Sequence, residues 1–260
     1  MENTFLITKC MLIPSEGSSL QEEYDIIAGN PIIDYYESVE SPSISMTVSF
    51  IDVDQVIGRK GITGGEYIDL IVKVDDEGAN DFKVMHDKQK MILNSVRNMI
   101  TESNKQVATL EFVSVETLVN ETARLNKKYT GNISDIVVEL LVGDTKGIQT
   151  AKTLFGPEDE SLGEDNVKKD RATNSYSFVG NLKRPFDTIQ WLCPKAQSAN
   201  DDFGFLFYET LDGYHFRSIK SLLEQDAITY QQTDAQGIAN KILQNNLNQT
   251  NDIGMNMRMG

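Results

Sequence analysis

The ten residues Ser43–Asp52 constrain the fold more than any other stretch of this sequence. They read SISMTVSFID, so apolar side chains alternate with small hydroxyl-bearing ones along most of the segment. Successive side chains of a β-strand point to opposite faces of a sheet, and a period of two therefore indicates a strand with one buried face. We expect the buried face to carry Ile44, Met46, Val48 and Phe50.

Strand-like runs fill the rest of the first 113 residues. They are Phe5–Ile13, Ile32–Tyr36, Glu66–Val74, Lys90–Thr101 and Lys105–Val113, with a further short strand within DEGANDFKVMHD. Short strands separated by turns are typical of an antiparallel barrel or sandwich. We predict such a β domain over residues 1–113.

The periodicity becomes helical after residue 113. Apolar side chains at helical spacing predict helices at Val115–Tyr129 and Ile133–Val142, with Ser114 as the N-cap of the first. A third helix is predicted to begin at Arg184-Pro185 and to end at Cys193-Pro194, because proline suits the first turn of a helix. Residues 144–175 are polar and are predicted to form a long exposed loop. Residues 114–200 thus read as a helical region.

The last segment, residues 201–260, begins with a hairpin. Gly204–Thr210 and Tyr214–Ile219 are strand-like and are joined by Leu211-Asp212-Gly213. A helical turn, a strand and a polar helix are predicted after it, at Ser221–Gln225, Ala227–Gln231 and Asp234–Asn248. We expect the start of a second, incomplete β domain, which makes the whole chain mainly β with α, an α+β fold.

The hairpin also holds the residues that most invite a catalytic interpretation. Glu209, Asp212 and His215 lie close together in the sequence, and a hydrolase using Glu209 and His215 is one alternative function. Strand alternation leaves two arrangements open, in which His215 and Arg217 pair with Glu209 across the ladder or lie at the surface. Since the chain has no nucleophile motif such as GxSxG, we favour a packed hairpin and assign no catalytic residue.

Other candidate sites are better explained by structure. The glycines of GRKGITGG do not have the spacing of a phosphate-binding loop, and a strand follows them, so we predict a turn. The acidic run VDDEGAND lacks the spacing of an EF-hand and is predicted to be a solvated loop. Cys10 and Cys193 are isolated and are expected to be reduced thiols rather than zinc ligands. We therefore expect no metal and no cofactor.

The charge of the chain argues against tight binding of nucleic acid. Its formal net charge is −15, and residues 1–113 alone hold 9 basic and 19 acidic side chains. Such a surface repels phosphates. It serves solubility, or it forms a surface past which DNA moves without sticking. No apolar run approaches the roughly 20 residues of a membrane helix, and MENTFLITKCMLIPSEG does not read as a signal peptide, so we expect assembly in a cytoplasm.

Four segments, taken in order, resemble a known family. Ser43–Asp52, Thr109–Leu125, Arg184–Leu192 and above all Phe205–Leu222 resemble the central baseplate hub protein of contractile-tailed, T-even-like phages. The wider relatives of that family include the hub part of type VI secretion spike proteins, which is a second alternative. The family is usually longer than this chain, and strands after its helical region complete a second barrel.

This resemblance implies a structural protein of the virion. Residues 1–113 would be a tail-tube-type antiparallel barrel, and three subunits would form a ring that adapts the six-fold tail tube to the three-fold central spike. The implied partners are two further copies of the chain, the tail tube protein, the central spike protein and other baseplate proteins. DNA would only pass through the lumen, the location would be the tail baseplate, and the hub itself would be no enzyme.

Overall fold

The computed structural model describes most of the chain, with interruptions. The described residues are 5–18, 20–52, 54–62, 64–74, 81–85, 89–102, 105–143, 146–156, 171–198 and 204–224. The chain divides into two compact units, Met1–Leu223 and Glu224–Gly260, and the described residues belong almost wholly to the first. The predicted strand Ala227–Gln231 and helix Asp234–Asn248 lie outside the described residues, as does most of the acidic run VDDEGAND.

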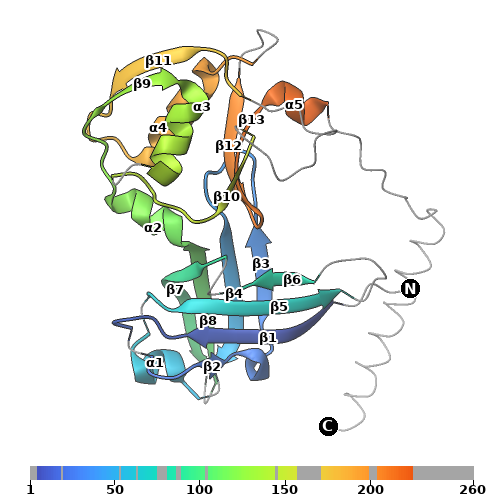
Figure 1. The fold of residues 1–260 in the computed structure, drawn as a ribbon. Helices are drawn as coiled ribbons and strands as arrows, with labels where there is room; N and C mark the ends of the chain where they lie inside the picture. The colour runs from blue at the N-terminus through green and yellow to red at the C-terminus, as the bar shows by residue number, and fades with distance from the viewer. Residues whose placement is uncertain are drawn as a thin grey trace, which may run out of the picture. The chain divides into compact units, whose positions relative to one another are not determined.

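The first half of the chain is a succession of strands, interrupted by two short helices (Figure 1). In chain order the elements are β1 Phe5–Ile13, β2 Tyr24–Asp25, η1 Ile27–Gly29, β3 Ile32–Tyr36, β4 Ser45–Asp52, α1 Val56–Lys60, β5 Tyr67–Val74, β6 Phe82–Val84, β7 Met91–Glu102 and β8 Lys105–Ser114. Every strand predicted in this half corresponds to one of these elements.

These strands form one antiparallel sheet in the order β2-β1-β5-β7-β8-β4-β3, with β6 added beside β5. In the described part of the chain, the ladder between β5 and β7 has one registered pair, Tyr67 and Ile92. The ends of the order are β2 and β3, and no pairing between them closes the sheet within the described residues. The antiparallel class is as predicted, but the closed barrel is not found, because β2 has only two residues with which to continue the ladder.

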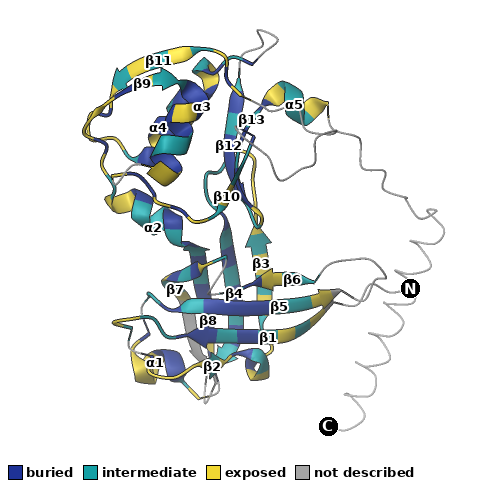
Figure 2. Ribbon diagram, in the orientation of Figure 1, coloured by how far each residue is buried: buried dark blue, intermediate teal, exposed yellow. Residues whose placement is uncertain are grey.

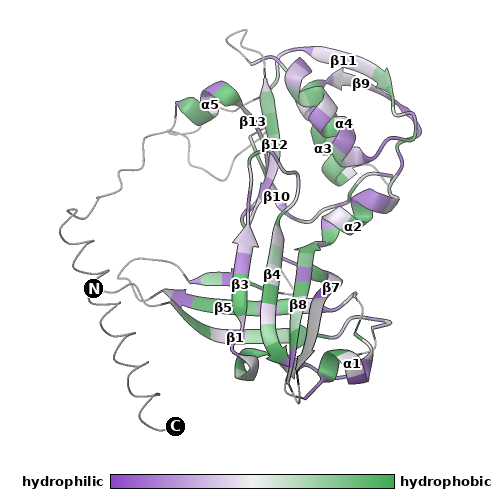
Figure 3. Cartoon of the chain, turned by 180° about the vertical axis from the view of Figure 1, so that it is seen from behind, coloured by the Kyte–Doolittle hydropathy of each residue, from purple (hydrophilic) through white to green (hydrophobic). Residues whose placement is uncertain are grey.

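Burial alternates along β4 as the sequence predicts. Met46, Val48 and Phe50 are buried, while the intervening residues are partly exposed (Figure 2). β4 pairs with β8 in register, so that these side chains lie beside the buried ones of the neighbouring strand. Hydrophobic residues run along β1, β4, β5 and β8 (Figure 3), and their buried members form a first hydrophobic cluster.

A buried carboxylate connects this sheet to the first helix. Asp52 ends β4, is fully buried, and accepts the backbone N–H groups of Val56 and Ile57, each at 2.9 Å. These are orphan donors of the first turn of α1, so Asp52 caps the helix. The glycine-rich segment was predicted as a turn before a strand. The strand is β5, but Gly58 lies within α1 and only Gly61 onward leaves the helix.

The second half mixes helices with short strands. Its elements are α2 Val115–Thr122, β9 Lys128–Asn132, α3 Ile133–Val138, a π-helical turn η2 Glu139–Gly143, β10 Thr153–Phe155, β11 Ser175–Val179, α4 Pro185–Leu192, η3 Cys193–Lys195, β12 Phe205–Thr210, β13 Gly213–Ser218 and α5 Ile219–Leu223. β9 pairs with β11, and β10, β13 and β12 form a separate sheet in that order. The pairing of β10 with β13 is parallel.

A second hydrophobic cluster lies between these elements. Its buried residues come mostly from α3, η2, α4 and the β12–β13 hairpin, and include Ile133, Leu140, Phe186, Ile189 and Phe216. α3 and α4 lie beside the β9–β11 ribbon (Figure 1). The only tryptophan of the chain, Trp191, packs at the margin of this cluster against Tyr176 and Phe178.

The helices differ from their predicted bounds. α2 ends at Thr122 because Ala123 is extended, with φ −67° and ψ 139°. Leu125 fits the helical period and is buried, but it lies outside the helix. Its N–H donates to the carbonyl of Lys183 at 3.0 Å rather than to a carbonyl of the preceding turn. Ser114 is the N-cap residue as predicted, but its hydroxyl accepts no backbone N–H of the helix and lies instead 2.9 Å from the hydroxyl of Thr117.

The predicted polar loop 144–175 is also partly structured. Of its described residues, Thr153–Phe155 form β10, and Ser175 begins β11. β10 is too short for a sequence period to reveal it, and its backbone is fixed only by pairing with β13, which lies about sixty positions further along the chain. Tertiary pairing therefore overrides a polar local composition.

Candidate functional site

The β12–β13 hairpin has a turn that only glycine fits. β12 and β13 pair antiparallel, with Thr210 opposite Gly213, as the predicted Leu211-Asp212-Gly213 turn requires. Gly213 has φ +149°, and a Cβ there would meet the carbonyl oxygen of Thr153 at 2.3 Å. The glycine therefore allows both the tight turn and the close approach of β10.

The register of the hairpin separates Glu209 from His215. Glu209 lies opposite Tyr214, and His215 lies opposite Tyr208. Because neighbouring side chains of a strand alternate, Glu209 and His215 point to opposite faces of the ladder. Pairing of His215 or Arg217 with Glu209 across the ladder, one of the two arrangements left open above, is therefore wrong.

His215 is held by aromatic rings and a hydroxyl. Its ring stacks on Tyr208 with centroids 4.7 Å apart and on Phe155 at 4.8 Å. Its Nε2 lies 2.9 Å from the hydroxyl of Thr210. These contacts fix the ring between β10 and β12, which is the packing role that the aromatic composition of the hairpin predicts.

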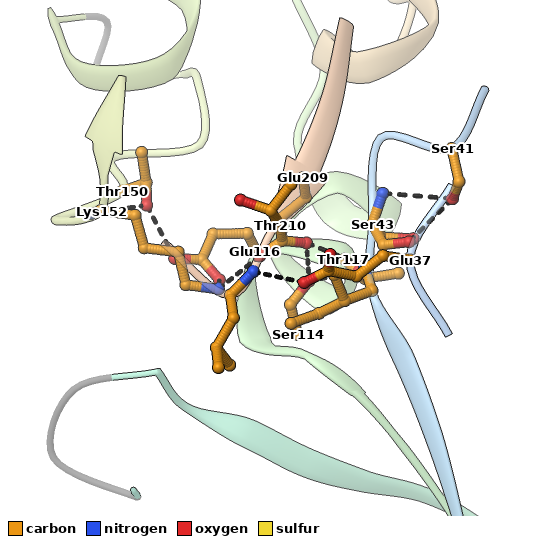
Figure 4. Close-up of polar contacts among 12 residues, drawn as sticks. Glu37, Ser41, Ser43, Ser114, Glu116, Thr117, Thr150, Lys152, Glu209 and Thr210 are labelled. Atoms are coloured by element: carbon orange, nitrogen blue, oxygen red, sulfur yellow. Dashed lines mark hydrogen bonds and ion pairs between the residues drawn. The ribbon is translucent and has the colours of Figure 1, made fainter. Parts of the chain in front are cut away.

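Glu209 is the centre of a buried polar cluster, which we call the junction cluster: Ile44, Ser114, Glu116, Thr150, Lys152 and Glu209 (Figure 4). Glu209 is fully buried. One carboxylate oxygen lies 2.5 Å from Nζ of Lys152. The other accepts the hydroxyl of Ser114 at 2.8 Å and the N–H of Ile44 at 3.0 Å. All three contacts suit a carboxylate, which only accepts.

Lys152 bridges two carboxylates. Its Nζ also lies 2.9 Å from Glu116, and its side chain is only 9% exposed. Glu116 in turn accepts the hydroxyl of Thr150 at 2.7 Å. Buried charges are costly unless they are paired and hydrogen-bonded, and here each one is. The cluster thus ties β12, the start of α2 and the segment before β10 to one another.

Burial and pairing shift the proton affinities of the cluster. Burial alone lowers the pKa of Lys152, but attraction by Glu209 and then Glu116, with their hydrogen bonds, raises that pKa above its usual value. Burial raises the pKa of Glu209, against the opposing effects of Lys152, Ser114 and Ile44. Burial, reinforced by the two carboxylates, holds the pKa of the Tyr214 phenol well above its usual value.

A second set of bonds joins the hairpin to the sheet. The N–H of Glu209 donates to the carbonyl of Ser41 at 3.4 Å, and the N–H of Leu211 donates to Glu37 at 2.6 Å. The side chain of Leu211 packs against the first hydrophobic cluster. The hairpin, whose inner face belongs to the second cluster, therefore contacts both cores.

The chemistry of the junction cluster fits a structural role better than a catalytic one. Its two carboxylates are held by Lys152 and by hydroxyl or backbone donors, and its lysine is held between the two carboxylates, so neither carboxylate is placed to abstract a proton from a substrate. Within the described residues, no three His, Cys, Asp or Glu side chains lie together as metal ligands. In the same part of the chain, none of the helices is both long and apolar enough to cross a membrane.

The sequence names three members of this cluster, Ile44, Ser114 and Glu209, but gives none of them the role that the structure shows. Glu209 was singled out, but as a possible acid or base. Glu116 lies in the first turn of the helix predicted after Ser114, and Lys152 lies in the predicted polar loop. A lysine in a polar segment gives no sequence signal of burial, because the signal lies in partners 36 and 57 positions away.

The fold and the site describe a mainly antiparallel α+β chain. In it, the buried carboxylate of Glu209 links the hairpin of the second hydrophobic cluster to the sheet of the first. No family model matches the chain, and no curated protein matches its sequence. Solved structures with a similar fold are a 43 kDa tail protein of prophage MuSo2 from Shewanella oneidensis and a tail protein from Neisseria meningitidis MC58. Both are 11% identical to this chain, with TM-scores of 0.43 and 0.48.

A third similar structure is the lidded PdpA-VgrG complex of Francisella, with 10% identity and a TM-score of 0.42. The alignments cover 80%, 89% and 88% of this chain, in the order given. They cover 54%, 57% and 30% of the other chains. This chain therefore spans at most slightly more than half of the length of these structures.

Proposed function

We propose that this chain is a structural subunit of a phage-tail-like assembly, a baseplate hub that forms a trimeric ring between the tail tube and a central spike. The observation that carries the proposal is the junction cluster. A β sheet domain is followed by helices and then by a hairpin, in the order that the family resemblance implies. Glu209, which looked catalytic in that hairpin, instead bonds it to the sheet through Ile44 and Ser114.

The proposed division of the chain follows from the same order of elements. Residues 1–113 form the tube-type domain, residues 114–200 form the helical region, and residues 201–260 begin a second β domain. Within the described residues the sheet ends at β2 and β3, and we propose that these edges are the kind through which neighbouring subunits dock. The partners proposed are the tail tube protein, the central spike protein and other baseplate proteins.

The charge supports passage of DNA rather than its binding. The first 113 residues hold more than twice as many acidic as basic side chains. A ring lined with such residues repels the phosphates of DNA moving through its lumen.

The oligomeric state tests the proposal. We expect the product of the full reading frame, alone or mixed with its candidate spike protein, to have the mass of a trimer by light scattering. Electron microscopy of the same sample should show a ring with three-fold symmetry. A monomer under both conditions would contradict the hub role.

A further inference from the structure

Glu66 is a fully buried glutamate whose carboxyl group no other group holds in the described part of the chain. Its side chain has no exposed surface, and neither carboxyl oxygen has a hydrogen-bond partner among the described residues. Buried polar groups are almost always hydrogen-bonded, and buried charges are almost always paired. Glu209 follows this rule, since Lys152, Ser114 and Ile44 hold its carboxylate. Glu66 does not.

A β-bulge places Glu66 on the buried face of the sheet. The N–H of Gly65 donates to the carbonyl of Leu93 at 2.9 Å, and the N–H of Leu93 donates to the carbonyl of Glu66 at 2.7 Å, so two residues lie opposite one. Gly65 has φ +98°, which together with this bonding defines a G1 bulge. Ile68 and Leu70 follow Glu66 at the period of the strand and are fully buried. The carboxyl group thus takes a place in a row of apolar side chains.

The bulge lies at the narrowest connection that the structure describes within the sheet. Beside it, β5 and β7 share the one registered pair Tyr67 and Ile92. This connection, which we call the β5–β7 seam, joins the strands β2, β1 and β5 to the strands β7, β8, β4 and β3. By contrast, β4 and β8 share eight registered pairs. A seam with so few backbone bonds opens at a lower cost in free energy than the rest of the sheet.

No neighbouring charge balances the carboxyl group. Burial raises the pKa of Glu66 above its usual range, against a smaller effect of the residue's own backbone N–H, and no other titratable side chain of the described residues contributes. Lys9 pairs with Asp69 at 2.6 Å, and Arg97 pairs with Glu111 at 2.9 Å. The charged and titratable side chains of the adjoining segments are Lys9 and Cys10 of β1, Glu16 after it, Tyr67, Asp69 and Lys73 of β5, Lys90 before β7 and Arg97 within it.

We propose that Glu66 couples the opening of the β5–β7 seam to pH. With its proton, the carboxyl group is neutral and stays in the interior, and the seam is closed. Without the proton, a carboxylate that has no counter-charge must reach water, and it does so when β5 separates from β7 at the bulge. The device is independent of the proposed hub function, since it depends only on the sheet of a single chain.

A rise in pH favours the open seam. Because folding raises the pKa of this carboxyl group, the closed seam binds the proton more tightly than the open seam does. Opening therefore releases a proton, and it becomes easier as pH rises from the unfolded pKa, about 4.3, to the folded one. Over that interval the opening equilibrium changes by up to about ten-fold per pH unit, the limit for one proton, and above it the equilibrium is constant.

Amide hydrogen exchange of the full chain, followed by NMR from about pH 5.5 to about pH 8.5, tests the proposal. The probes are the amides of Gly65 and Leu93, which bond across the seam. The reference is the amide of Leu110, which lies opposite Val48 in the β4–β8 ladder. After correction for the intrinsic exchange rates, we expect the protection of the two seam amides to fall as pH rises, by up to about ten-fold per unit, and then to level off. Protection of Leu110 should change less.

Three variants identify the titrating group. Glu66→Gln keeps the size of the side chain but has no titrating proton, so the pH dependence at the seam should disappear. Glu66→Met should abolish it too and should also melt at a higher temperature than the wild type, because it removes an unpaired polar group from the interior. Glu16→Gln, at an exposed glutamate of the segment after β1, should keep the pH dependence of the wild type.

Three outcomes would overturn the proposal. The first is a protection of the seam amides that does not change with pH in the wild type. The second is a pH dependence that persists in the Glu66 variants, because another group would then be titrating, and Glu66→Met alone decides this point if Glu66→Gln does not fold. The third is an equal loss of protection at Leu110, which would show that the whole sheet opens rather than the seam.

Discussion

At the residue scale, Lys152 is the buried charge on which the junction cluster depends. It lies in a segment whose composition predicts a solvated loop, yet it is buried between Glu116 and Glu209. Removing one partner from a buried ionic group leaves the others uncompensated, whereas replacing the group as a whole is often tolerated. The net contribution of the Lys152 charge to stability is therefore measured by changing its partners together with it.

A double-mutant cycle tests this coupling. We expect Lys152→Met to lower the free energy of unfolding by about 3–5 kcal/mol, because Glu209 and Glu116 lose their counter-charge. Glu209→Gln added to Lys152→Met should recover part of that loss, since the amide carries no charge. Urea denaturation of the wild type, both single variants and the double variant measures the interaction. Strictly additive effects would contradict the coupling.

The raised pKa of Lys152 also predicts a dependence on pH. A cation whose pKa is higher in the folded state stabilises the fold fully below its unfolded pKa, about 10.4, and loses this effect as pH rises through the folded value. The stability gap between wild type and Lys152→Met should therefore be constant from pH 8 to about 10 and shrink above that. Urea midpoints measured across this range give the gap. A stability gap that widens at high pH would show that folding lowers the pKa of Lys152 rather than raising it.

At the scale of elements, the sequence predicts best where burial and backbone share one period. β4 alternates between buried and exposed residues, so its sequence determines both its type and its buried face. α2 is less well predicted, because Leu125 continues the helical period while its backbone already bonds to the segment at Lys183. Periodicity records which side chains are buried, and a different backbone can bury the same side chain.

The short strands show a second limit. β10 is defined by its neighbour β13 rather than by its own residues, and it approaches so closely that position 213 must be glycine. Neither fact can be read from the local sequence. The hairpin could be predicted, and so could Glu209 as a residue of interest, but its partners could not.

The glycine requirement can be measured against a matched control. Gly213 and Gly131 have nearly the same φ, +149° and +150°, but a Cβ at Gly131 would meet nothing within 4 Å. Alanine at either position should cost about 1–3 kcal/mol of backbone strain, because a φ near +150° is adopted almost only by glycine. Only Gly213→Ala should cost clearly more, because its methyl group collides with the carbonyl of Thr153. Thermal melts of both variants give the comparison, and equal losses would argue against the close approach of β10.

At the scale of the whole molecule, the junction cluster connects the two hydrophobic clusters. Each cluster contains one buried cysteine, Cys10 in the first and Cys193 in the second, and both thiols are free. Burial raises the pKa of both thiols to about 12, so neither reacts as a thiolate near pH 8 while its core is closed. The two cysteines therefore report separately on the opening of the two cores.

Labelling of these thiols tests whether the junction cluster couples the cores. In the wild type, Cys10 and Cys193 should react with a thiol reagent at similar rates at pH 8, because the cores open together. In the Lys152→Met, Glu209→Gln double variant the two rates should diverge. Mass spectrometry of peptides at successive times resolves the two sites. Divergent rates in the wild type, or equal rates in the variant, would contradict coupling through the cluster.

The junction cluster also dictates an order of events while the chain is being made. Ile44 and Ser114 both bond to the carboxylate of Glu209, which follows them in the sequence by 165 and 95 positions. Neither bond can form until Glu209 has been synthesised. Until β12 has left the ribosome, Lys152 has only Glu116 as a charged partner and the inner face of the helical region is uncovered. A product that stops before Glu209 therefore leaves the apolar side chains of the second cluster without the hairpin that buries them, which makes it a target for proteases.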